Sequence, residues 1–208
     1  MLGVAYHMMQ PFTNSNKLGN VLIILLVLGL FLSILSLSFT IIEAFLTQFY
    51  IFSITINLDI LLSKISIILH LLAGLVFISW IYFVNKDLKK LYGNYSMSSI
   101  EVLINPLIPI YNMWAIGNIF ANVADALTGE DEYLKNKCLS LNKKLPWLFG
   151  VMFVSYGIEL IGNRIIYHNP MFFIFSDMVY IFLYYIWLKI SLITTKSIGY
   201  KIKMRNLN

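Results

Sequence analysis

The sequence predicts an all-helical integral membrane protein, a four-transmembrane-helix bundle with a proline-containing cytoplasmic segment. The 208-residue chain is 59% hydrophobic and 12% charged, whereas about 25% of residues are charged in an average soluble domain. Its mean hydropathy is +0.78. A bilayer-spanning helix needs about 20 apolar residues. Four stretches reach that length, at about 19–43, 65–85, 145–166 and 171–195, and we treat residues 1–208 as a single membrane domain.

The first span carries a stripe of small and hydroxyl residues. Gly29, Ser33, Ser36 and Thr40 recur at positions that share one face of a helix. Lipid gives two helices no hydrophobic reason to associate, so small residues in a span mark close helix contacts. We therefore expect this stripe to face the interior of the bundle. No small-residue cleavage site follows the stretch, so we expect it to remain as an anchor.

Residues 45–64 connect the first two spans, and their pattern leaves two alternatives open. Apolar and polar side chains alternate from Phe52 to Ile60, which is typical of a strand. A lone strand has no partner in a helical membrane protein, and open strand edges are avoided in lipid. A helix in the headgroup region or an extended cover over the bundle fits the segment equally well.

The segment 102–140 contains an apolar run interrupted by prolines. Pro106 and Pro109 each remove a backbone donor and disfavour helix in the preceding residue. We predict a re-entrant or interfacial elbow here, followed by an amphipathic helix that begins near Asn112. Trp114 would then lie at the headgroup level. The elbow is either a structural support under the bundle or a loop that lines a ligand site.

The basic residues determine the orientation. If the proline-containing run does not cross the bilayer, only Lys64 and Arg164 lie outside, so thirteen (15 − 2) of the 15 basic residues lie on the cytoplasmic side. If the run did cross, the larger group would hold only ten. Positively charged residues accumulate in cytoplasmic loops, so the four-span arrangement is favoured. It places both termini in the cytoplasm.

The third and fourth spans form a tight antiparallel hairpin, because few residues separate them. Gly150 and Gly157 lie seven residues apart on the third span. By the same argument as for the first span, we expect these glycines to face a neighbouring helix of the same bundle, although contacts with a second copy of the chain would give the same pattern.

Three ionisable side chains inside the spans are the main candidates for a polar pocket. His70, Glu159 and Asp177 all lie about 10 Å below the outer surface, at a rise of about 1.5 Å per residue. Together they could bind a cation or relay protons, because ionisable groups within a membrane often mark such pathways. The plainer alternative is that each bonds to a neighbour or pairs with Arg164 or Lys64 near the outer interface.

One part of the chain resembles a known family. A Trp-Ile-Tyr step near the end of the second span is followed by an asparagine, a short linker and a Pro-Ile-x-Asn-x-Trp element. These features resemble the bacterial membrane domain-of-unknown-function family numbered 4328. The resemblance implies a four-span architecture and a bacterial inner-membrane location, and it implies no particular reaction. The positions that carry it are Trp80, Tyr82, Asn85, Pro109, Asn112 and Trp114.

The residue types exclude several classes of function. We find no acid, base and nucleophile set, no phosphate-binding loop and no cofactor motif, so we expect a protein that is not an enzyme and holds no cofactor or metal. The net charge of +5 reflects topology rather than a nucleic-acid surface. We expect the lipid bilayer as partner, together with another membrane protein or a second copy of the chain. Two classes remain, a non-enzymatic scaffold or accessory subunit, and a small proton- or cation-coupled transporter or channel.

Overall fold

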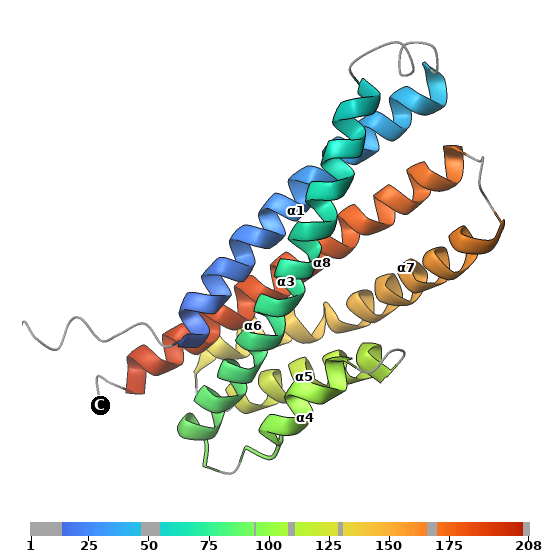
Figure 1. The fold of residues 1–208 in the computed structure, drawn as a ribbon. Helices are drawn as coiled ribbons and strands as arrows, with labels where there is room; N and C mark the ends of the chain where they lie inside the picture. The colour runs from blue at the N-terminus through green and yellow to red at the C-terminus, as the bar shows by residue number, and fades with distance from the viewer. Residues whose placement is uncertain are drawn as a thin grey trace, which may run out of the picture.

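The computed structural model describes residues 14–46, 55–93, 95–107, 111–128, 131–165 and 170–205. Its described residues form helices and connecting turns, with no strand among them (Figure 1). The elements in chain order are α1 (Asn14–Phe45), α3 (Thr55–Leu91), α4 (Ser99–Ile104), the short 3₁₀ helix η2 (Asn105–Leu107), α5 (Tyr111–Leu127), α6 (Glu132–Asn142), α7 (Leu145–Ile165) and α8 (Pro170–Arg205).

Within the described residues, three helices are long and apolar enough to cross a bilayer. They are α1, α3 and α8, with mean hydropathies of 2.9, 2.4 and 1.7 over their most apolar windows. The chain is therefore a membrane-embedded helical protein. The fourth predicted span coincides with α7, which is 21 residues long.

Helix α1 occupies the centre of the long helices and packs along both α3 and α8. Helix α7 packs against α8, whereas α3 and α7 make hardly any direct contact. The start of α1 and the end of α8 lie at the same end of the molecule (Figure 1). Away from this end, α3 and α7 diverge on either side of α8.

Two glycines let α1 approach its neighbours closely. A Cβ atom on Gly19 would lie 2.4 Å from Thr195 Oγ1 and 2.9 Å from Trp80 Nε1. A Cβ atom on Gly29 would lie 2.4 Å from Cε1 of Tyr184. Any larger residue would force these helices apart, so both glycines are required for this packing.

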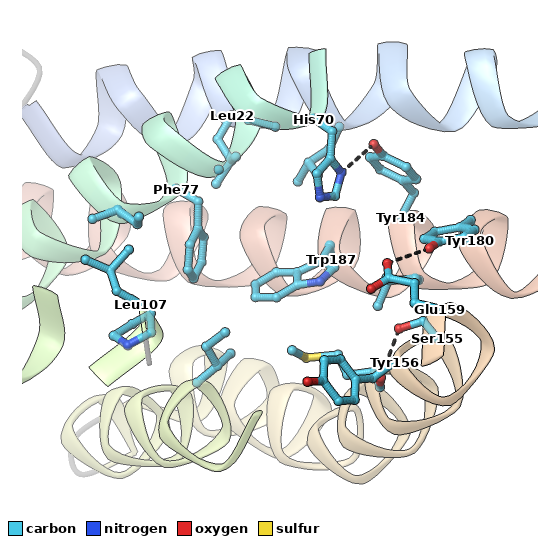
Figure 2. Close-up of a pocket in the computed structure, with 18 residues that line it drawn as sticks. Leu22, His70, Phe77, Leu107, Ser155, Tyr156, Glu159, Tyr180, Tyr184 and Trp187 are labelled. Atoms are coloured by element: carbon cyan, nitrogen blue, oxygen red, sulfur yellow. Dashed lines mark hydrogen bonds between the residues drawn. The ribbon is translucent and has the colours of Figure 1, made fainter. Parts of the chain in front are cut away.

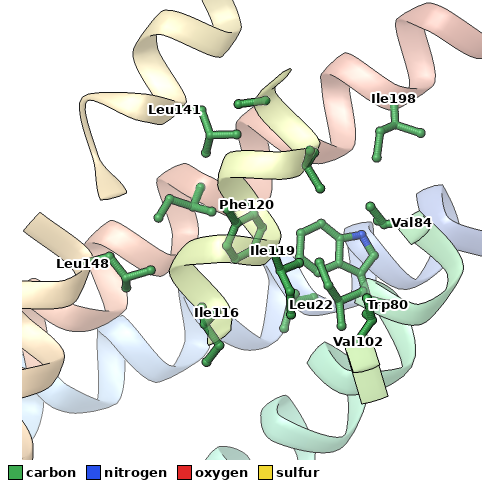
Figure 3. Packing of buried hydrophobic residues seen from close by; sticks show 14 of the residues in the cluster. Leu22, Trp80, Val84, Val102, Ile116, Ile119, Phe120, Leu141, Leu148 and Ile198 are labelled. Atoms are coloured by element: carbon green, nitrogen blue, oxygen red, sulfur yellow. The ribbon is translucent and has the colours of Figure 1, made fainter. Parts of the chain in front are cut away.

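Most of the apolar core lies at the end where α1 begins and α8 ends. Helices α4, α5 and α6 pack there beneath the long helices, and Trp80 of α3 is fully buried beside Phe120 of α5 (Figure 3). The two ring centroids are 6.1 Å apart. Burial recurs along α5 with helical spacing, so this helix is amphipathic.

The segment around the prolines is not one continuous helix. Helix α4 ends at Ile104, η2 follows, and α5 begins at Tyr111. The helix changes from α to 3₁₀ at Asn105, which keeps helical backbone angles (φ −58°, ψ −40°) although it precedes Pro106. Pro109 lies outside the described residues.

The connection between the first two spans is largely helical where it is described. Helix α3 begins at Thr55, well before the predicted span boundary near residue 65. The strand alternative is therefore wrong for residues 55–64. Residues 47–54 lie outside the described part of the chain. The period-2 pattern does not establish a strand here, because apolar residues at these positions are equally compatible with a helix that is exposed to lipid on most sides.

Candidate functional site: a cavity between α3 and α7

A cavity of about 480 Å³ occupies the space between α3 and α7, with α8 behind it (Figure 2). It exists because α3 and α7 both pack on other helices and not on each other. Its polar lining residues are His70, Ser155, Tyr156, Glu159, Tyr180 and Tyr184. The remaining lining is mainly apolar and includes Leu22, Leu26, Ala73, Phe77, Leu107, Ile116, Met152, Leu183 and Trp187.

His70 projects from α3 into one wall of the cavity. Its Nδ1 atom lies 3.1 Å from the hydroxyl oxygen of Tyr184 on α8, and the two groups share a hydrogen bond (Figure 2). The tyrosine hydroxyl donates when Nδ1 carries no proton. The imidazole meets the Tyr184 ring edge-on, with centroids 6.2 Å apart. Tyr184 is itself held against Gly29, so the small-residue stripe of α1 sets the position of this pair.

Glu159 projects from α7 into the opposite wall. The hydroxyl of Tyr180 donates a hydrogen bond of 2.7 Å to its Oε1 atom. Tyr180 and Tyr184 lie one turn apart on α8, so the same helix face serves both walls of the cavity. The hydroxyl of Ser155, one turn from Glu159, donates to the backbone oxygen of Met152 instead.

Asp177 is not among the residues that line the cavity. Its Oδ2 atom accepts a 2.6 Å hydrogen bond from the hydroxyl of Thr40 on α1. The structure thus brings His70 and Glu159 to one cavity and holds Asp177 against α1 instead. The side chain of Arg164 lies outside the described part of the structure.

Aromatic side chains close the cavity toward the core. The rings of Phe77 and Trp187 meet edge-to-face with centroids 4.8 Å apart. Pro106 and Leu107, from the broken helix between α4 and α5, line the same end. The 3₁₀ helix η2 therefore contributes two residues to the cavity lining.

Several cavity residues were not singled out from the sequence. Tyr180, Tyr184 and Trp187 lie on α8 at spacings of four and three residues. Aromatic residues with a polar hydroxyl or indole N–H at helical spacing, beside an intramembrane carboxylate, are the signal that could have identified them.

Two of the residues that carry the family resemblance, Trp80 and Asn85, have structural roles. Trp80 is buried in the core, and Asn85 Nδ2 donates a 3.2 Å hydrogen bond to Ser99 Oγ, which ties α3 to the start of α4. The Tyr82 ring packs edge-on against its neighbour Phe83. Trp114 is 57% exposed. Asn112 is the second residue of α5, and its side chain is outside the described part of the structure.

The remaining reactive groups lie in ordinary surroundings. Cys138 is buried in α6, and burial raises the pKa of its thiol, which disfavours the reactive thiolate. No group of three or more metal-ligating side chains occurs among the described residues.

Comparisons of the chain with protein-family models, with curated proteins and with solved structures find no match.

Proposed function

We propose that this chain is a non-enzymatic, multi-pass membrane protein that binds an amphiphilic small molecule in the cavity between α3 and α7. The observation that carries the proposal is the cavity itself, which is mainly apolar and has a few polar groups on two facing walls. Small-molecule sites typically have about this size, within roughly 300–1,000 Å³, and this lining.

The exposure of the lining residues supports entry from the bilayer. His70, Gly74 and Glu159 are all exposed on the surface of the chain, although they line the cavity. The opening therefore lies between α3 and α7, where lipid surrounds a membrane-embedded chain. A ligand that partitions into the bilayer would reach the site without crossing water.

The proposal includes a topology and a location. Helix α7 forms a fourth span in the hairpin with α8, and both termini face the cytoplasm of a bacterium, as the basic residues and the family resemblance suggest. The end that carries α4, α5 and α6 would lie at the cytoplasmic interface. A role as an accessory or interaction subunit fits a protein that holds a ligand and shows no reactive centre among its described residues.

A cavity-filling variant tests the binding. Gly74 lines the cavity, and a Cβ atom there would meet nothing within 4 Å. Gly74→Trp should therefore fill the space without disturbing the fold. Gly150→Trp is the matched control, because Gly150 on α7 has equally open surroundings and does not line the cavity.

Native mass spectrometry of the purified protein provides the measurement. We expect an amphiphile to co-purify with the wild type and with Gly150→Trp, and to be absent from Gly74→Trp. Equal occupancy in all three proteins, or none in any of them, would contradict the proposal.

A second candidate, a proton- or cation-coupled transporter or channel, is favoured by one specific observation. The His70–Tyr184 and Tyr180–Glu159 pairs place two ionisable groups and two hydroxyls on one cavity. Flux of protons or Na⁺ into proteoliposomes, abolished in Glu159→Gln while membrane insertion stays intact, would establish this function. Wild-type liposomes no leakier than empty ones would rule it out.

A further inference from the structure

We infer that the ligand of this cavity carries a positively charged nitrogen at one end of a single apolar body, and that Glu159 receives this nitrogen. The inference rests on the proposed function, because it specifies the chemistry of the molecule that the cavity holds.

The charges of the lining point to a cation. Among the described residues that line the cavity, Glu159 is the only carboxylate, and none is lysine or arginine. A carboxylate in a mainly apolar, membrane-embedded site is costly without a compensating charge. Tyr180 supplies one neutral hydrogen bond to Oε1, which orients the carboxylate, and no lysine or arginine among the described lining residues compensates its charge. A bound ammonium group would supply the opposite charge at the point where the lining lacks it.

The aromatic residues near Glu159 favour the same chemistry. Tyr156 lies one turn from Glu159 on α7, while Tyr180 and Trp187 reach the cavity from α8 (Figure 2). Aromatic rings attract alkylammonium groups through their electron-rich faces, and sites for quaternary ammonium ions commonly combine such rings. The apolar lining residues, among them Phe77 and Met152, would contact the hydrocarbon part of the ligand. The cavity volume of about 480 Å³ suits one chain or ring system rather than a two-chain phospholipid.

The test compares two probes of equal chain length, dodecyltrimethylammonium and uncharged dodecyl glucoside. Binding is measured on the full-length protein in phosphatidylcholine nanodiscs, with empty nanodiscs subtracted to remove partitioning into lipid. The quaternary ammonium group does not titrate, so the comparison is independent of the charge state of the probe. We expect the wild type to bind the cation about tenfold more tightly than the uncharged probe.

Glu159→Gln should lose about that tenfold preference and keep its affinity for dodecyl glucoside, and the retained affinity shows that the variant is folded. Glu43→Gln removes a carboxylate from α1 that does not line the cavity, and it should retain the preference.

The outcomes separate the two proposals. Equal affinity of the wild type for both probes, or an unchanged preference in Glu159→Gln, would overturn the inference and leave the proposed function standing. Failure of the wild type to bind either probe would overturn the proposed function as well.

Discussion

At the residue scale, the small side chains of α1 determine how the site is assembled. Gly29 lets the Tyr184 ring approach the α1 backbone, and Tyr184 in turn holds His70. The hydroxyl of Thr40, farther along the same stripe, bonds to Asp177. One face of α1 thus positions two polar side chains of α8, and substitutions on that face should alter the cavity.

Gly29→Ala should destabilise the protein, because the added methyl group would lie 2.4 Å from the Tyr184 ring. Overpacking of this kind costs about 1–3 kcal/mol. Gly150→Ala is the control, since its methyl group would meet nothing within 4 Å. The control should be neutral or stabilising by up to about 1 kcal/mol, because alanine favours helix over glycine. Thermal unfolding in detergent measures both, and equal melting temperatures would contradict the role assigned to Gly29.

The same residues show how far sequence reasoning reaches. The stripe on α1 is confirmed as a contact face at Gly29 and Thr40. Gly150 and Gly157 make no matching contact within the chain, because no atom outside the local helix lies within 4 Å of a Cβ built on either one; a contact with a second copy stays a prediction. Small residues permit a close contact, but they do not supply the partner helix.

The predicted polar pocket shows a second limit of prediction from sequence. Residue spacing predicts the depth of a side chain along a helix, and His70 and Glu159 do line one cavity. Spacing says nothing about how α7 and α8 are rotated relative to α1. That rotation turns Asp177 toward Thr40 and brings Tyr180, one turn away, to Glu159.

At the element scale, the amphipathic helix α5 stabilises the end of the molecule where α1 begins and α8 ends. Phe120 is fully buried between Trp80 and Trp187, with ring centroids 6.1 Å from each. The prolines before α5 predict a helix break, and the described residues show α4 continuing into the 3₁₀ helix η2 at Asn105, whereas Pro109 lies outside them. That these turns would help to line a cavity was not predictable, because it depends on where α3 and α7 separate.

The stability lost when a side chain of α5 is truncated should depend strongly on whether that side chain is buried or exposed. Phe120→Ala should lower the free energy of unfolding by about 3–5 kcal/mol, because it leaves a void in a packed aromatic cluster. Trp114→Ala, at a residue that is 57% exposed, should change it by less than about 0.5 kcal/mol. Denaturant unfolding in mixed micelles distinguishes the two, and similar losses would show that α5 is not packed as described.

The start of α6 should respond to acid. Asp131 caps this helix, and the Tyr200 hydroxyl, followed by the Tyr133 amide, donates to its carboxylate and lowers its pKa below the usual 3.8. Because the folded-state pKa lies below the unfolded one, the stabilisation is complete above about pH 4 and is lost as the pH falls through the folded-state value.

Hydrogen exchange checks this cap. Amides in the first turn of α6 should lose protection below about pH 4 in the wild type, relative to Asp131→Asn at each pH. The asparagine variant keeps an acceptor at the cap and removes the titrating charge. A wild type and a variant with the same pH profile would contradict the assignment.

At the scale of the whole molecule, the helices are tightly packed at one end, and two of them separate toward the other end. The buried core gathers where α4, α5 and α6 pack under the long helices, and the cavity lies where α3 and α7 diverge (Figure 1). Composition is sufficient to predict a membrane-embedded helical chain. Composition cannot predict that α3 and α7 diverge. The divergence arises because α1 packs on both α3 and α8, whereas in the described part of the chain α8 is the one long helix on which α7 packs.

The proposed topology predicts which positions are accessible from each side. Single cysteines introduced at Lys137 and Asn208, in a background that lacks Cys138, should react with a membrane-impermeant maleimide only after the cells are opened. A cysteine at Asn57 should react in intact cells. Labelling of the Lys137 position from outside would contradict the orientation that the basic residues indicate.

The most direct test of the central claim is photoaffinity labelling of the protein in native membranes with a single-chain alkylammonium that carries a diazirine on its chain. We predict that the crosslinks, mapped by mass spectrometry, concentrate on cavity residues such as Ala73, Phe77 and Met152. Excess unlabelled dodecyltrimethylammonium should remove these crosslinks. Crosslinks spread evenly over the lipid-facing residues, including Leu71 and Phe153, and insensitive to competition would show that the cavity holds no specific ligand.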